Sequence, residues 1–223
     1  MTPILRALAS AIALSATALP ALAQTTAAPA GETAAAGQVE TLPDVVLGQA
    51  DAPLTVVEYA SFTCSHCAAF HEEGFPKLKA EYIDTGKVKF IQRDVYFDQV
   101  GLWAGVLAHC GGDEKYYAVS DLLLSQQEKW LDAKSGDDLA ANLRKLGAGA
   151  GFSDAQMDAC WADQQKVEQL VATFQKNAGA DEIEGTPTFV IGGEKVQNQP
   201  WNQLKAKIDE KLAEADTAAP AQN

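Results

Sequence analysis

The sequence has few basic residues, with 17 lysines and arginines against 30 aspartates and glutamates, which gives a formal net charge of −13. Proteins that bind a phosphate backbone need a positive surface, so this deficit argues against nucleic acid as a partner. No internal repeat is found, and after residue 23 no apolar run is long enough to span a bilayer. The 200 residues that follow residue 23 are enough for one domain of ordinary size, or for one domain that carries a large insertion.

The first 23 residues have the pattern of an export signal. Arg6 is followed by an apolar run over residues 7–19 and by the small residues of the segment 20–23, which fit a leader-peptidase site. We predict a signal peptide over residues 1–23 that is cleaved after Ala23. A membrane helix is the alternative, but the apolar run has about 13 residues and a span needs roughly 20.

Only four cysteines are present, and all of them follow the predicted cleavage site. An exported chain enters a compartment in which disulfides persist. Each cysteine there is either part of a structural bridge or a reactive thiol. The spacing of the cysteines in the sequence is the evidence that assigns one of these two roles to each of them.

A strand, a helix and a second strand are predicted early in the chain. Residues 54–60 form a short, mostly apolar run typical of a buried strand. Apolar or small residues then recur every three or four positions from Cys67 to Tyr82, which marks one face of a helix that Pro76 should kink. Residues 88–91 form the next strand, and the resulting βαβ unit should have parallel strands.

Residues 98–180 have a helical pattern throughout, with stop signals that divide the range into four or five helices. Strand character returns over residues 188–191 and 194–196 on either side of a two-glycine turn, which predicts a hairpin. Pro200 should open a last helix. Helix caps inside the helical range are expected at Asp113, Ser135 or Asp137, and Ser153.

A parallel βαβ unit followed by an antiparallel ββα unit is the thioredoxin arrangement. We therefore predict an α/β, thioredoxin-like fold, with βαβ plus ββα around a central mixed sheet and an inserted all-helical domain. The predicted ranges are a flexible linker over residues 24–41, the two parts of the thioredoxin-like domain over 42–97 and 181–214, the helical insertion over 98–180 and a flexible tail over 215–223.

The run Cys64-Ser65-His66-Cys67 lies where the first strand meets the helix. Cys64 should lie at the helix N-terminus, where N–H groups and the positive end of the dipole stabilise a thiolate, so it is the predicted attacking thiol. Cys67 lies one turn further, within reach of a mixed disulfide, and is the predicted resolving thiol. His66 would stabilise the thiolate further, unless it is merely exposed, and Ser65 adds a hydroxyl donor.

Two other interpretations of the cysteine pair stay open. One is half of a zinc site, with His71 four residues beyond Cys67, although two more ligands are normally needed and Cys110 and Cys160 are solitary. The other is a structural bridge, which would close too short a loop to add much stability. We predict no metal and no cofactor other than the redox-active disulfide of Cys64 and Cys67.

Glu58 is an acid in the middle of an apolar strand, where it is costly unless it is hydrated or functional. We interpret it as a buried group with a raised pKa that accepts and returns the Cys67 proton; a tolerated acid at a strand edge is the alternative. Pro187 begins a strand that should be interior, where proline is disfavoured. A cis Thr186-Pro187 bond would resolve this conflict and leave the Thr186 backbone free to pair with a substrate chain.

The run Ser61-Phe62-Thr63-Cys64-Ser65-His66-Cys67, with Glu58 before it and Gly185-Thr186-Pro187-Thr188-Phe189 downstream, resembles the DsbA family of bacterial periplasmic thiol:disulfide oxidoreductases, in the thioredoxin superfamily. The resemblance covers roughly residues 45–212. It implies a periplasmic dithiol oxidase that acts on reduced or unfolded exported proteins and is re-oxidised by a membrane quinone-linked partner of the DsbB type. Ser65 and Thr186 depart from the proline and valine usual at these positions in the best-known members.

The resemblance also implies roles for single residues. Cys64 would be the nucleophile, Cys67 the resolving thiol and His66 the residue that stabilises the thiolate. Glu58 would be the buried acid. The cis-proline loop would be formed by Thr186 and Pro187.

Cys110 and Cys160 fall in the helical range, and we predict a structural disulfide between them, worth roughly 4 kcal/mol for a loop of about 50 residues. Two buried free thiols are the alternative. The competing functions are a disulfide isomerase or client-specific reductase on the same fold and, more remotely, a chaperone with a vestigial pair. Isomerases of this superfamily resemble dimers built through an added N-terminal domain, for which residues 24–41 are too short, so we expect a monomer.

Overall fold

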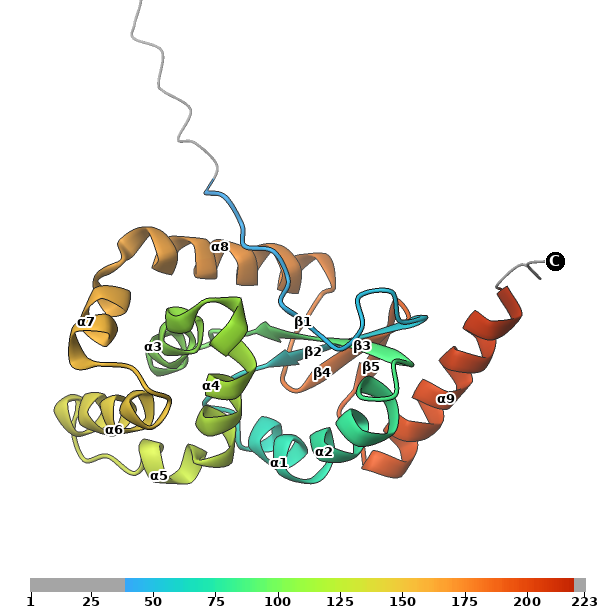
Figure 1. Ribbon diagram of the computed structural model, residues 1–223, viewed down its shortest axis with the longest axis horizontal. Coiled ribbons are helices and arrows are strands. Elements are labelled where there is room, and N and C mark those ends of the chain that lie inside the picture. Colours follow the sequence, from blue (N-terminus) through green and yellow to red (C-terminus); the bar gives the residue numbers. More distant parts are fainter. Residues whose placement is uncertain (1–38, 219–223) are drawn as a thin grey trace, which may run out of the picture. The chain divides into compact units, whose positions relative to one another are not determined.

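The computed structural model describes residues 39–218 (Figure 1). The predicted signal peptide lies outside this range, as do most of the predicted linker and part of the predicted tail. The centre is a mixed five-stranded sheet with the strand order β1-β3-β2-β4-β5, in which only β2 and β3 are parallel. The strands are β1 (Val46–Leu47), β2 (Leu54–Ala60), β3 (Val88–Asp94), β4 (Thr188–Ile191) and β5 (Glu194–Gln197).

The sheet is covered on both faces, as the apolar character of β2 requires. On one face Val56 packs in a cluster with Phe70 and Leu204, which belong to the helices drawn below the sheet in Figure 1. On the other face Tyr59 packs with Ala178 of the helix drawn above it. The covering helices are α1 (Ser65–Glu73), α2 (Phe75–Leu78) and α9 (Trp201–Ala218) on the first face and α8 (Gln164–Ala180) on the second.

The helix after β2 is not one kinked helix but three segments. α1 ends before Gly74, and α2 begins at the next residue with Pro76 in its first turn. A proline in a first turn costs no helical hydrogen bond, because the first N–H groups have no partner inside the helix. A π-helical segment, η1 (Lys79–Ile83), follows. The break therefore lies at the glycine, two residues before the predicted proline kink.

The insertion lies between β3 and β4 and contains six α-helices and a short 3-10 helix, where the sequence predicted four or five helices. Ser135 and Ser153 are N-caps, and each accepts a backbone N–H three residues later. Asp113 is not a cap; it begins its helix after Gly112, so it contributes charge to the first turn. The segments before α8 are α3 (Gln99–Ala108), η2 (His109–Gly111), α4 (Asp113–Ser125), α5 (Gln127–Leu131), α6 (Gly136–Gly149) and α7 (Asp154–Ala162).

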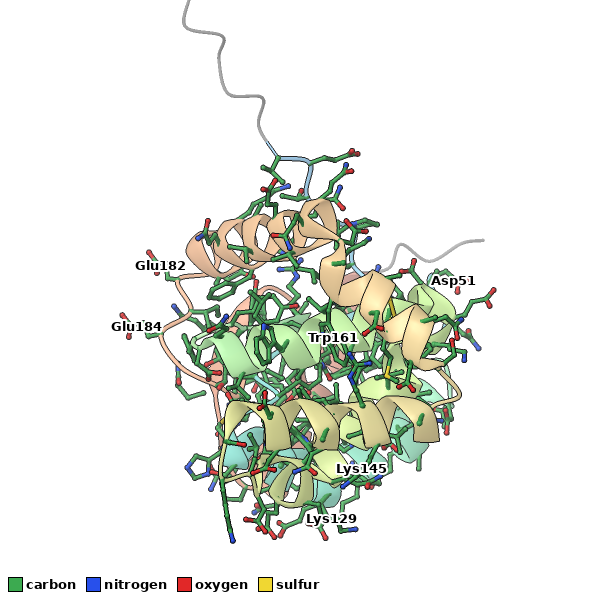
Figure 2. The ribbon with its side chains drawn as sticks, turned by 90° about the vertical axis from the view of Figure 1, so that its left-hand side faces the viewer. Asp51, Lys129, Lys145, Trp161, Glu182 and Glu184 are labelled. Atoms are coloured by element: carbon green, nitrogen blue, oxygen red, sulfur yellow. A yellow bond between two sulfur atoms is a disulfide. The ribbon has the colours of Figure 1, made fainter. Side chains whose placement is uncertain are left out.

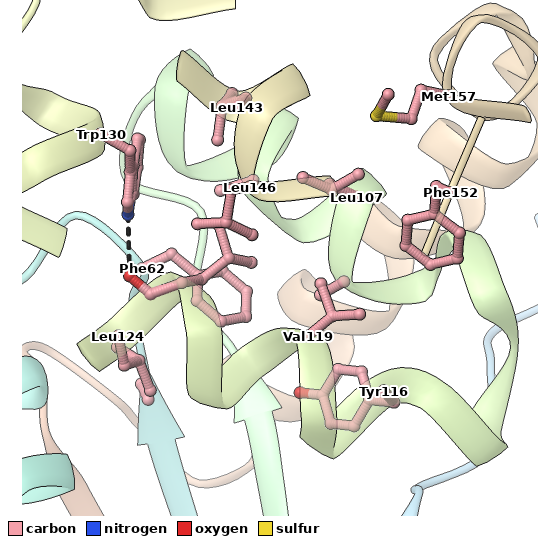
Figure 3. Close-up of a cluster of buried hydrophobic side chains, with 14 of the residues drawn as sticks. Phe62, Leu107, Tyr116, Val119, Leu124, Trp130, Leu143, Leu146, Phe152 and Met157 are labelled. Atoms are coloured by element: carbon pink, nitrogen blue, oxygen red, sulfur yellow. Dashed lines mark hydrogen bonds between the residues drawn. The ribbon is translucent and has the colours of Figure 1, made fainter. Parts of the chain in front are cut away.

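The insertion has its own apolar core, which reaches the thioredoxin-like part (Figure 3). Leu107, Leu143 and Met157 are fully buried in it, and the Trp130 indole N–H donates to the Leu123 carbonyl at 2.7 Å. Phe62, from the turn that follows β2, is part of the same cluster. The helical insertion is thus packed directly against the turn that carries the cysteine pair.

The predicted bridge of the insertion is present: Cys110 of η2 and Cys160 of α7 form a disulfide, with their Cα atoms 5.5 Å apart. Cys64 and Cys67 are free thiols. Within residues 39–218, no helix combines the length and the apolar character that a membrane span requires.

Both ends of the described range are more ordered than predicted. Thr41, in the predicted linker, accepts a hydrogen bond from Lys176 of α8 at 3.1 Å. α9 continues to Ala218, so residues 215–218 are helical and not part of a flexible tail.

Candidate active site

Cys64 is the N-cap of α1, at the end of the short turn that follows β2. Its backbone is extended, with φ −86° and ψ 117°, and its N–H donates to the Ser61 carbonyl at 3.1 Å. The thiol is half-buried, and Sγ lies 3.3 Å from the Thr186 carbonyl oxygen. The turn therefore brings the sulfur to the first N–H groups of α1 and to the loop that precedes β4.

Several hydrogen bonds favour the ionised form of Cys64 and lower its pKa from 9.0 to about 5. The largest contribution comes from the thiol of Cys67. Partial burial opposes it, and the Thr186 side chain and the backbone N–H groups of Cys67 and His66 add smaller favourable contributions. A sulfur with this pKa is about 99% thiolate at pH 7, against a few per cent for an ordinary cysteine.

We expect the reduced protein to show a thiolate titration with a midpoint near pH 5, which the far-ultraviolet absorbance of the thiolate can follow. The Cys64→Ser variant should lose this transition, because the remaining thiol of the pair does not ionise in that range. A midpoint near pH 9 in the wild-type protein would contradict the geometry described above.

Cys67 is fully buried in the first turn of α1. Its pKa is raised, chiefly because its thiol is the hydrogen-bond donor to Cys64, and further by burial and by the negative charges of Glu58 and Cys64. The two thiols are therefore strongly unequal: one is a ready nucleophile and leaving group, and the other holds its proton. Any step that involves Cys67 as a thiolate needs a group that takes up or supplies a proton.

Glu58 is a titratable side chain close enough to Cys67 for its charge to raise the pKa of that thiol. It is 2% exposed in the central strand, and within the described residues its Oε1 has no hydrogen-bond partner. Burial, followed by the charge of Cys64, raises its pKa from 4.5 to about 8. An unpaired acid in the interior is costly, so its persistence in an otherwise apolar strand favours a proton-transfer role over a tolerated surface charge.

The Thr186-Pro187 peptide bond is cis. Pro187 is buried directly before β4, and the Thr188 hydroxyl donates to the Gly185 carbonyl at 2.7 Å, which closes the turn around the proline. The Thr186 backbone thereby lies against Cys64 Sγ. Two exposed acids, Glu182 and Glu184, project from the segment that leads into this loop (Figure 2).

Ser65 and His66 are both exposed at the start of α1. In the described part of the chain, no hydrogen bond joins the His66 ring to Cys64; the contact of this residue is made by its backbone N–H. His71 is buried and bonds to Asp121 at 2.8 Å. Residues 39–218 contain no group of three or more His, Cys, Asp or Glu side chains arranged for a metal ion.

Two contacts near the cysteine pair were not predicted from the sequence. The Thr63 hydroxyl donates to Asp98 at 2.8 Å, and Asp98 also caps α3. Gln127, the first residue of α5, donates to the carbonyls of Phe62 and Cys64. Each pairs residues that are far apart in the chain, so neither periodicity nor local spacing indicates them.

Comparisons with known proteins agree with this geometry. The family model described as Thioredoxin matches residues 40–210. A Rickettsia bellii protein, provisionally named a protein-disulfide oxidoreductase, is 35% identical over 173 residues, which cover 77% of this chain and 66% of that protein. Disulfide bond formation protein D of Bacillus subtilis is 25% identical over 191 residues, covering 82% of this chain and 83% of that protein.

Among solved structures, the crystal structure of Wolbachia pipientis alpha-DsbA1 is similar with a TM-score of 0.72 and 29% identity, covering 79% of this chain and 94% of that chain. The chain spans only 61% to 66% of the length of the first three Rickettsia relatives. The predicted fold class, a thioredoxin-like fold with a helical insertion, is confirmed. The chain belongs to the thioredoxin family and, within it, to the DsbA-like thioredoxin-fold disulfide oxidoreductases.

Proposed function

We propose that this protein is a dithiol oxidase that introduces disulfides into exported proteins. The observation that carries the proposal is the inequality of the two thiols, with the pKa of Cys64 lowered to about 5 and that of Cys67 raised. A stabilised Cys64 thiolate favours the reduced form of the pair, which makes the disulfide form a stronger oxidant. The low pKa also makes Cys64 a good leaving group.

The reaction proceeds in two exchanges. A client thiolate attacks Cys64 Sγ of the Cys64–Cys67 disulfide, the S–S bond breaks, and Cys67 leaves and takes up a proton, for which Glu58 is the nearby acid. A second client thiolate then attacks the client sulfur of the mixed disulfide and releases Cys64 as a thiolate. The client loses two electrons and the cysteine pair gains them. In the reverse direction Cys67 resolves the mixed disulfide.

The same proposal includes the location and the partners. Cleavage after Ala23 would deliver the chain to the periplasm, and the Cys110–Cys160 bridge supports an oxidising compartment. The substrates would be reduced or unfolded exported proteins. A membrane quinone-linked re-oxidase of the DsbB type would return the pair to the disulfide, and the protein would act as a monomer.

The test is the equilibrium reduction potential of the Cys64–Cys67 pair in glutathione buffers, measured on the protein with Cys110 and Cys160 in place. We expect a value more oxidising than about −180 mV, because the reduced form is stabilised by the Cys64 thiolate. A value below roughly −230 mV would contradict a disulfide donor and indicate a reductase. The redox state of the pair in cells is the second measurement, and an oxidase should be recovered mainly as the disulfide.

A further inference from the structure

Gln127 connects the helical insertion to the turn that presents the attacking cysteine. It is the first residue of α5, and only 5% of the residue is exposed. Its Nε2 donates to two carbonyl oxygens of that turn, those of Phe62 at 2.8 Å and of Cys64 at 3.0 Å. A glutamine amide has two N–H donors, so one side chain can satisfy both acceptors at once.

The two carbonyls differ in how many other hydrogen-bond donors they have. The Cys64 carbonyl also accepts from the N–H groups of Cys67 and Ala68, which are the first bonds of α1. The Phe62 carbonyl receives no other hydrogen bond from the described residues. Phe62 itself is 1% exposed, and a buried carbonyl without a donor is unfavourable. Gln127 therefore stabilises this conformation of the turn, because its amide supplies the hydrogen-bond donor for the buried Phe62 carbonyl.

The residue between these two carbonyls is held as well. Thr63 donates through its hydroxyl to Asp98, the N-cap of α3. Three successive residues, from Phe62 to Cys64, are thus fixed by side chains of the insertion. The thioredoxin-like part contributes bonds to this turn through Ser61: its carbonyl accepts from the Cys64 N–H, and its hydroxyl accepts from the Thr63 N–H at 3.3 Å and lies 3.1 Å from the Thr63 hydroxyl.

We propose that Gln127 is a positioning residue for Cys64: its amide fixes the two carbonyls of the turn and so holds Sγ against the first N–H groups of α1 and against Thr186. The inference rests on the proposed function in that Cys64 is the reacting thiol. Gln127 touches neither the sulfur nor a client. It acts by keeping the peptide planes of the turn in the one orientation that presents Cys64 to its stabilising donors.

The test compares Gln127→Met with Asn142→Leu. Methionine keeps the length of the side chain and removes the donors. Asn142 is the matched control, because its Nδ2 also donates to two carbonyls, those of Trp130 and Asp132, but entirely within the insertion. We expect Gln127→Met to raise the midpoint of the Cys64 thiolate titration by roughly half to one pH unit. Asn142→Leu should leave the midpoint unchanged.

The reduction potential should move in parallel. A full pH unit is a tenfold change in the equilibrium constant, so Gln127→Met should make the pair less oxidising by up to about 30 mV. An unchanged midpoint in Gln127→Met, or an equal shift in both variants, would overturn the inference. Failure of the proposed function would give a different result. The reduction potential of the wild-type protein would then itself be reducing, independent of the potential of Gln127→Met.

A measurement on the wild-type protein covers the case in which Gln127→Met does not fold. The side-chain amide protons of Gln127 should exchange with solvent much more slowly than those of Gln165, an exposed glutamine at the start of α8. Equal exchange rates would show that the two bonds to the turn are not maintained in solution, and the inference would be wrong.

Discussion

Replacement of Cys64 by serine is expected to reduce the rate of disulfide transfer at least about a thousandfold, to the level of the uncatalysed exchange. A hydroxyl cannot form the mixed disulfide. The variant also leaves Cys67 as the remaining thiol of the pair, buried and with a raised pKa, so it cannot substitute as a nucleophile. The measurement is the rate at which a reduced client gains disulfides in the presence of each variant.

Cys67→Ser is the matched control because it removes a sulfur from the same turn of α1 and keeps Cys64. Offered a client that contains a disulfide, this variant should attack one of its sulfurs through the Cys64 thiolate and release the other as a thiolate. The mixed disulfide should then accumulate, because Cys67 is no longer present to resolve it, and it should be visible as a covalent complex that reductant releases. Equal loss in both variants without any trapped complex would contradict the roles assigned to the two thiols. Retained activity in Cys64→Ser would defeat the oxidoreductase proposal altogether.

The second large effect is expected at Glu58. Its pKa is raised in the folded protein, from 4.5 to about 8, so the folded state holds a proton that the unfolded state has lost over this window. Stability therefore falls as pH rises from about 4.5 towards 8. We expect Glu58→Leu to remove this dependence and to increase the free energy of unfolding at pH 8 by at most roughly 4 kcal/mol, the value of the full shift, with little effect at pH 4.

The oxidised protein is the right form for this measurement, since in the reduced protein Cys64 titrates with the opposite sign. The Cys64 thiolate, whose charge adds to the pKa shift of Glu58, is absent from the oxidised form, so the effect there comes from burial and is smaller than the full shift. The lowered pKa of Cys64 stabilises the reduced fold above pH 9, and that contribution is lost as pH falls from 9 towards 5. Denaturant unfolding at several pH values compares the wild-type protein with Glu58→Leu and with Glu72→Leu, a substitution at an exposed site of α1. A Glu58→Leu profile as steep as that of the wild-type protein would contradict the burial of an unpaired acid.

Glu58→Leu should also slow the chemistry. Without the acid, Cys67 loses the buried carboxyl group that can exchange a proton with it, and we expect resolution of the mixed disulfide to be at least about tenfold slower. The variant would thus be more stable and less active. A gain in stability together with a loss of activity distinguishes a proton-transfer role of Glu58 from a structural role.

Much of the site could be predicted from the sequence, because several of its residues conflict with the preferences of the strand in which they lie. An acid in an apolar strand and a proline at the start of an interior strand each violate a strong rule, and such violations gather at functional sites. Glu58 is indeed buried, and the bond before Pro187 is cis. The position of Cys64 at a helix N-terminus followed from the junction of strand and helix alone.

Other parts could not be predicted, because they depend on distant contacts. β1 has only two residues and exists through its pairing with β3, so it has no detectable period of its own. α5 has five residues and lacks a clear amphipathic repeat, which is why the sequence predicts fewer helices in the insertion than the structure has. Gln127 lies in that helix, and its bonds span more than 60 positions of the chain.

The order of the strands has a consequence for the nascent chain during synthesis. β2 pairs with β4, which begins at Thr188, 128 positions after β2 ends at Ala60. At a synthesis rate of about 5–20 residues per second, the nascent chain carries its reactive cysteines for roughly 6–25 s before this partner strand exists. During that interval one edge of β2 is unpaired, a template for association with other chains. The newly made protein therefore passes through a stage in which it needs the same protection from aggregation as any other unfinished polypeptide.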